Sequence, residues 1–368
     1  MAGNSLGIAE AGPLGVGVAV SPAAATGASS RGWIESRLFD LSFFTLSPLA
    51  GLAVVWCALR SHWGGHVLLL AVFLVAIPHY VSSFSFYLGD ENLAYYRTRR
   101  IAFFAGPLMI LLSVLGLRLL KFDAIVQSTM YIWNVYHVSL QSAGILSIYR
   151  RLNNGLISEG RFARASILGV NSTMAFWNID RFAPLYTFLQ RVHFPVWTLR
   201  PVLLSLSILA VAAFVKSLCG RSRRLAVPEL FFIVSTFGMF HFYLWVPDLN
   251  LATFCMLMGH FLQYLGIVWL LNRRKYRTAQ GSQQQRLLSA VSEHTPLLLF
   301  ALCFVGTMFY LTQRVSMRLG IPITYVVLWN ALTLVHFYLD GLVWAFKDPF
   351  VRKSIGPYLF PDSHMVKQ

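Results

Sequence analysis

The stretch "IPITYVVLWNALTLVHFYLDGLVWAF" (321–346) decides the fold class, because it is apolar over the thickness of a lipid bilayer. An α-helix needs about 20 mainly apolar residues to cross ~30 Å of hydrocarbon. The stretch nevertheless carries His336 and Asp340, one helical turn apart. Ionisable side chains inside a membrane are costly unless a partner or a ligand compensates them. The stretch therefore predicts a membrane helix that carries a functional site.

The composition extends this interpretation to the whole chain. Of its 368 residues, 57% are hydrophobic and only 12% are charged, too few charges for the surface of a soluble protein. We predict an all-α, polytopic integral membrane bundle, formed by residues 31–350 as a single domain. A disordered tail rich in Gly, Ala and Ser (1–30) precedes it and a cytoplasmic tail (351–368) follows. Residues 1–30 lack the basic and apolar regions of a signal peptide.

The lengths of the apolar segments predict about ten transmembrane helices. The segments are 41–60, 66–88, 101–118, 124–149, 165–182, 199–218, 226–246, 249–271, 295–314 and 321–346. The fifth segment is the most polar, and nine helices result if it lies on the membrane surface instead.

The net charge of +16 is explained by short basic clusters in alternate loops. The clusters begin at Arg31, Arg97, Arg150, Arg221, Arg273 and Lys347. Loops rich in Lys and Arg are typical of the cytoplasmic side, so membrane topology explains the charge better than nucleic-acid binding does. With ten helices all six clusters fall on one side, which places both termini in the cytoplasm, in our interpretation that of a bacterial inner membrane.

Histidines are the strongest functional signal inside the predicted helices. Five predicted helices carry one each: His79, His137, His241, His260 and His336. At about 1.5 Å per residue, all except His241 lie roughly 16 to 22 Å below the outer boundary, and His241 lies nearer the outer face. A single histidine in a membrane helix is more often a packing residue. Four at one depth favour a shared site.

Polar residues accompany these histidines at helical spacing, as a ligand site with supporting groups requires. Asn134 and Gln141 flank His137, Gln263 follows His260 by three positions, and Asp340 follows His336 by four. The expected metal ligands are His79, His137, His260, His336 and Asp340. Asp340 is also the expected catalytic group, and the expected further cofactor-binding residues are Asn134, Gln141, His241 and Gln263.

Neutral imidazoles with one carboxylate suit Fe, Zn, Mn or Cu, and resemble the ligand set of non-haem iron oxygenases. We therefore predict a membrane-embedded, metal-dependent oxidoreductase or oxygenase, using iron, that acts on a hydrophobic small molecule and receives electrons from a partner. Motifs of serine hydrolases, zinc proteases and phosphate-binding loops do not occur in the sequence.

Two short stretches, "IPHYVSS" (77–83) and "VHFYLDG" (335–341), resemble in part the bacterial Brp/Blh carotenoid-cleaving dioxygenases. That family consists of polytopic membrane proteins with isolated intramembrane histidines. The resemblance implies a similar helical architecture. It covers only these two stretches, and no residue roles carry over from it.

Two other functions fit the same histidines. In a haem protein they would be axial ligands for electron transfer. In a transporter of protons, metal ions or a small solute, His and Asp side chains would line the pathway.

Overall fold

The structure is a computed structural model, and it describes residues 32–153, 157–219, 224–277 and 282–360. Within these residues all regular secondary structure is helical, which confirms the all-α prediction. The longer helices are α2 (Ser47–Arg60), α6 (Gly106–Leu119), α7 (Asp123–Leu152), α8 (Ile157–Phe176), α10 (Leu199–Cys219), α11 (Val227–Phe240), α13 (Leu249–Tyr276), α15 (Thr295–Arg318) and α16 (Pro322–Val343). The shorter ones are α1 (Arg37–Asp40), α3 (Gly64–Ala71), α4 (Ile77–Ser82), α5 (Asp90–Thr98), α9 (Ala183–Arg191), α12 (Phe242–Trp245), α14 (Gln283–Glu293) and α17 (Pro349–Leu359). The predicted tail 1–30 lies outside the described residues.

Six helical segments in the described part of the chain are long and apolar enough to cross a bilayer. They are Gly64–Leu88, Ile101–Leu119, Val196–Cys219, Val227–Trp245, Leu249–Tyr276 and Leu297–Arg318. The pair Arg37–Thr45 and Ser47–Arg60, bent by 54°, makes seven if it counts as one span. Three further predicted segments coincide with α7, α8 and α16, which do not meet this criterion. The number ten therefore remains a prediction.

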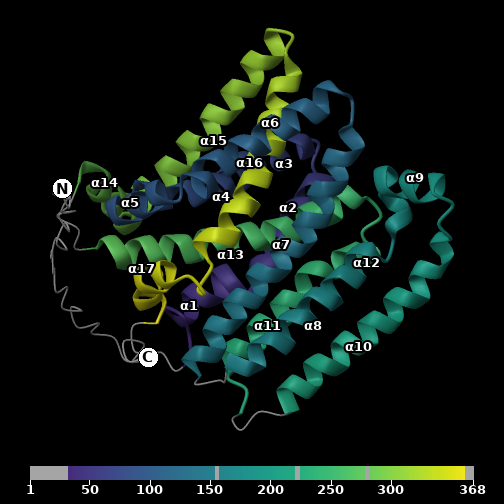
Figure 1. The fold of residues 1–368 in the computed structure, drawn as a ribbon, viewed down its shortest axis with the longest axis horizontal. Helices are drawn as coiled ribbons and strands as arrows, with labels where there is room; N and C mark the ends of the chain where they lie inside the picture. Colours follow the sequence, from purple (N-terminus) through teal and green to yellow (C-terminus); the bar gives the residue numbers. More distant parts are fainter. Residues whose placement is uncertain (1–31, 154–156, 220–223, 278–281, 361–368) are drawn as a thin grey trace, which may run out of the picture.

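Helix α13 lies inside the bundle, whereas α6, α10 and α15 lie at its periphery (Figure 1). In its most apolar window, 72% of α13 is buried, against 6% of the α10 segment. Close helix packing at the centre depends on small residues. At Gly51 of α2, an added Cβ would lie 2.3 Å from the carbonyl oxygen of Cys255 in α13. The peripheral helices instead offer apolar side chains to the lipid.

Each of three π-helical segments lies shortly before a proline. The segments are η1 (Leu41–Thr45) before Pro48, η2 (Val72–Ala76) before Pro78, and η4 (Ile101–Ala105) before Pro107. Proline has no N–H and its ring clashes with the preceding turn, so a regular α-helix cannot pass through it undisturbed. A wider turn absorbs the clash. The second of these turns ends three residues before His79.

The bend between η1 and α2 leaves the carbonyl of Phe44 without its helical donor, because the residue four positions later is Pro48. Two other helices supply donors. The Ser235 hydroxyl donates to this carbonyl at 2.7 Å and the Gln263 amide donates at 3.1 Å. Since an unsatisfied carbonyl in hydrocarbon costs several kcal/mol, these bonds stabilise the bend.

A polar layer at one end of the bundle ties α17 to α5. Residues 351–359 of the predicted C-terminal tail belong to α17, and Asp348 caps the first turn of this helix by accepting from the Phe350 N–H at 2.9 Å. Asp348 also accepts from the Tyr95 hydroxyl at 2.5 Å and pairs with Arg99 at 2.9 Å. The Asp348 carboxylate therefore helps to fix the C-terminal helix to the bundle.

Asp348 should make the docking of α17 sensitive to acid. Burial acts to raise the pKa of this carboxyl, but hydrogen bonds from Tyr95 and the Phe350 N–H, with the Arg99 charge, lower the pKa below its ordinary value. Because the pKa is lower in the folded state, the ionised Asp348 stabilises the fold at pH values above the unfolded pKa of about 3.9. This stabilisation is lost as the pH falls through the folded pKa. We expect Asp348→Asn to lower stability by up to about 1 kcal/mol at pH 7. The difference from wild type in thermal unfolding should shrink below about pH 4. A difference that does not change between pH 7 and pH 3 would contradict this account.

The ends of the helices lie on two sides of the bundle. The C-terminal ends of α7 and α10 lie at the bottom of Figure 1, and the connections between α6 and α7 and between α15 and α16 lie at the top. Single cysteines at Arg99, Arg151, Arg274 and Lys353, in a background without other reactive thiols, should all be labelled from the cytoplasmic side. A cysteine at Lys121 should be labelled from the opposite side. Labelling of positions 151 and 274 from different sides would mean that α8 does not span. Arg221 and Arg223 lie outside the described residues.

Candidate metal centre

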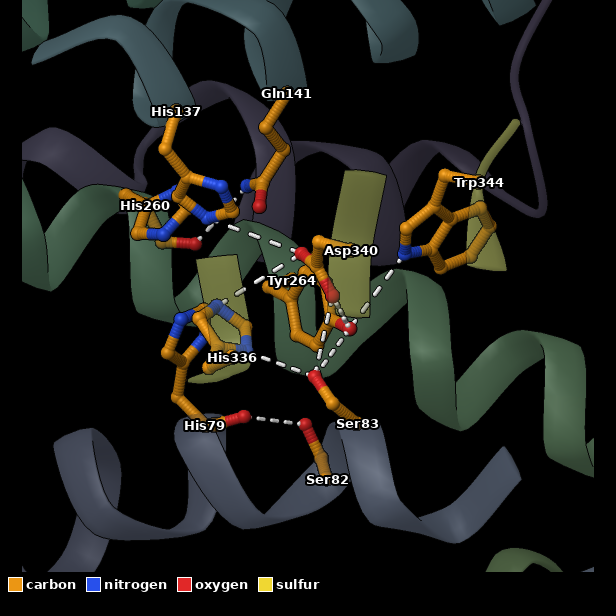
Figure 2. A network of polar contacts seen from close by, with 10 residues as sticks. All are labelled: His79, Ser82, Ser83, His137, Gln141, His260, Tyr264, His336, Asp340 and Trp344. Atoms are coloured by element: carbon orange, nitrogen blue, oxygen red, sulfur yellow. Dashed lines mark hydrogen bonds and ion pairs between the residues drawn. The ribbon is translucent and has the colours of Figure 1, made fainter. Parts of the chain in front are cut away.

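Four histidines from four helices meet in the interior of the bundle (Figure 2). His79 comes from α4, His137 from α7, His260 from α13 and His336 from α16. One ring nitrogen of each lies within 4.8 Å of the corresponding atoms of the other three, and all four side chains are buried. These are the four histidines expected from the sequence to share one depth, so this group could hold a metal ion.

The nitrogen atoms of this group fit a metal because the protein leaves them unsatisfied. Each of the four rings has at least one buried nitrogen without a hydrogen-bond partner among the described residues. The rings contact one another mainly edge to face, with the centroids of His79 and His336 4.4 Å apart and those of His137 and His260 5.0 Å apart. Leaving buried acceptors unpaired costs about 1–3 kcal/mol each. One ion coordinated by one nitrogen of each ring removes that cost for these four atoms.

The hydrogen bond to Ser83 assigns the ligand atom of His336. Ser83 Oγ lies 2.7 Å from His336 Nδ1 and donates its own proton to Asp340 Oδ1 at 3.1 Å. Its oxygen therefore accepts from the Nδ1–H of His336. The Nε2 atom of His336 has no hydrogen-bond partner in the described residues, so its lone pair is free to bind an ion.

Asp340 is held by one carboxylate oxygen and presents the other to the histidines (Figure 2). Oδ1 accepts hydrogen bonds from the Tyr264 hydroxyl at 2.6 Å and from Ser83. Oδ2 lies 3.8 Å from the Nε2 atoms of both His137 and His336. This separation is too long for hydrogen bonds. Oδ2 is therefore available to a bound ion or to a molecule on that ion.

Tyr264 and Ser83 belong to the centre, although the sequence pattern did not single them out. Tyr264 lies four residues after His260 and Ser83 four residues after His79, the same spacing that singled out Asp340. Their oxygen atoms are 2.8 Å apart, and Trp344 Nε1 donates to the Tyr264 oxygen at 3.5 Å. Both hydroxyl groups orient Asp340.

The other predicted residues lie elsewhere or act differently. Gln141 donates to the backbone carbonyl of His260 at 3.2 Å, so it supports the backbone of α13 and not the imidazole ring of His260. Gln263 is engaged with the Phe44 carbonyl. Asn134 is buried one turn from His137, and its Oδ1 has no partner among the described residues. The His241 side chain is exposed, bonds the Gly238 carbonyl of its own helix and does not join the four histidines.

Aromatic side chains surround the four histidines. Phe337 stacks on His137 with centroids 4.4 Å apart, and Phe261 lies 4.6 Å from the ring of His79. Tyr80 contacts His336 at 5.4 Å. This shell keeps the centre in a low-dielectric environment with little room for bulk water.

The chain matches no protein-family profile, no curated protein sequence and no solved structure. The geometry of the site is therefore what indicates a function.

Proposed function

We propose that this protein is a membrane-embedded, metal-dependent oxidoreductase whose four interior histidines hold an iron ion. The observation that carries the proposal is the group of buried, unpartnered imidazole nitrogens contributed by four helices. The proposed substrate is lipid-soluble, the proposed electron donor is a separate protein, and the proposed location is the inner membrane of a bacterium.

The types of donor atom support a borderline first-row metal. Imidazole nitrogens suit Fe, Zn, Mn and Cu, and the described part of the chain brings no cysteine into the group. Iron bound here would supply oxidative chemistry. The chain's own residues bind the ion through imidazoles, hold Asp340 Oδ2 beside two of them, and exclude water with aromatic rings.

A shallow groove on one face of α7 supports access for an apolar substrate directly from the bilayer. It is lined by Thr129, Ile132, Trp133 and Tyr136. The ring of Trp133 lies 6.2 Å from that of Phe337, which stacks on His137. The groove is therefore separated from a proposed ligand by two aromatic side chains.

The same geometry is less suited to haem. A porphyrin lies between the two rings that ligate its iron, whereas here adjacent imidazole rings are in direct contact. A visible spectrum and elemental analysis of the purified protein test the choice. We expect stoichiometric iron without a Soret band. A Soret band would indicate haem, and proton or metal flux into proteoliposomes without a tightly bound ion would indicate transport.

A further inference from the structure

Two arginines converge at the ends of two long helices, away from the histidines. Arg151 is the penultimate residue of α7, and Arg352 lies on α17, shortly after the end of α16. Both positions lie just beyond the apolar parts of α7 and α16, which places them at the boundary of the bilayer.

Two phenylalanines in ring contact link the two arginines. The guanidinium carbon of Arg151 lies 4.7 Å from the ring centroid of Phe360. Arg352 Nε donates to the Phe346 carbonyl at 3.4 Å, and the Phe346 and Phe360 rings are 6.4 Å apart. Each arginine therefore has one fixed contact to an aromatic residue and several N–H groups left over.

The positive charge at this place is not compensated within the described residues. Neither Arg151 nor Arg352 forms an ion pair there, and the neighbouring Arg150 pairs with Glu229 at 3.2 Å. Burial lowers the pKa of Arg151, and the charge of Arg352 lowers it further. Two neighbouring arginines that have no ion-pair partner among the described residues repel each other, so a bound anion would stabilise this arrangement.

We propose that Arg151 and Arg352 together bind the phosphate group of an anionic phospholipid. Guanidinium groups bind phosphate oxygens through paired N–H donors. Basic pockets at the ends of membrane helices suit anionic headgroups, which the bilayer presents at this depth. The rings of Phe346 and Phe360 offer an apolar surface beside the phosphate. This site is independent of the metal centre.

The test measures phospholipid retained by the full-length protein. Wild type, Arg151→Gln, Arg352→Gln and the double variant are placed in zwitterionic nanodiscs containing a minor fraction of phosphatidylglycerol, and native mass spectrometry measures the lipid retained after release. With each basic residue near the surface contributing on the order of 1 kcal/mol, we expect each substitution to weaken retention about fivefold. The matched control is Arg164→Gln on α8, an exposed arginine outside this pair.

The proposal fails if the double variant retains phosphatidylglycerol as wild type does, or if Arg164→Gln loses it equally. A second arm adds inorganic phosphate in purely zwitterionic nanodiscs and measures thermal stability. Stabilisation by phosphate, with none by phosphatidylglycerol, would overturn the assignment to a lipid. Stabilisation by phosphatidylglycerol that disappears in the double variant supports it.

Discussion

Replacing His260 by alanine is expected to remove the bound metal from the protein, and alanine at His79, His137 or His336 should do the same. Each substitution deletes one nitrogen donor from a group whose ligand atoms lie within 4.8 Å of one another. Loss of a supporting residue alone typically weakens metal affinity about 10–100-fold, so we expect loss of a direct ligand to exceed about a hundredfold. Elemental analysis after purification in detergent measures this, and circular dichroism with size-exclusion chromatography checks folding.

His241→Ala and His294→Ala are the matched controls, because both side chains are exposed and lie outside the group. They should keep the metal content of wild type. If one of the four alanine variants keeps the metal content of wild type, the histidine that it replaces is not a ligand. Wild-type protein with neither stoichiometric metal nor haem would refute the metal site as a whole.

Asp340→Asn should weaken metal retention about 10–100-fold and abolish oxidative turnover while the protein stays folded. The amide keeps the volume of the side chain and can still accept a hydrogen bond from Tyr264 or Ser83, but the negative charge beside His137 and His336 is lost. Competition with a chelator measures retention, and the thermal unfolding midpoint measures stability.

The Tyr264→Phe substitution tests whether the Tyr264 hydroxyl positions Asp340 or whether Tyr264 only fills space in the centre. If Tyr264 acts through Asp340, its loss should reduce metal retention in wild type and have little further effect in the Asp340→Asn background, a coupling that a double-mutant cycle detects. Equal losses in both backgrounds would mean that Tyr264 acts independently of the carboxylate. Full metal content and full activity in Asp340→Asn would make Asp340 a structural hydrogen-bonding residue.

Helical periodicity predicts much of the candidate metal centre, because residues four apart share one face of a helix. This spacing identified Asp340 beside His336. The estimate of depth placed four histidines in one layer and His241 outside it. The same spacing also links Ser83 to His79 and Tyr264 to His260. It did not single these two out, since Ser and Tyr are common in membrane helices and carry no charge whose burial demands an explanation.

Gln263 shows where spacing misleads. It lies three residues after His260 and so shares a face with it, yet its amide donates to the Phe44 carbonyl on another helix. The Phe44 carbonyl lacks a helical donor because of Pro48, which lies 215 positions before Gln263 in the chain. Gln263 reaches this carbonyl only because η1 and α2 pack against α13. Local sequence cannot reveal which helix supplies a missing donor.

The sequence by itself determined the helical class and the apolar character of the chain, and it predicted a common depth for four histidines, because hydropathy and a rise of about 1.5 Å per residue are local properties. The tertiary structure alone decided which faces meet. The bond between Ser83 and His336 joins residues 253 positions apart. Bends at prolines and close approaches at residues such as Gly51 set the rotation of each helix about its axis, and that rotation determines whether a polar side chain faces the centre, a neighbouring helix or the lipid.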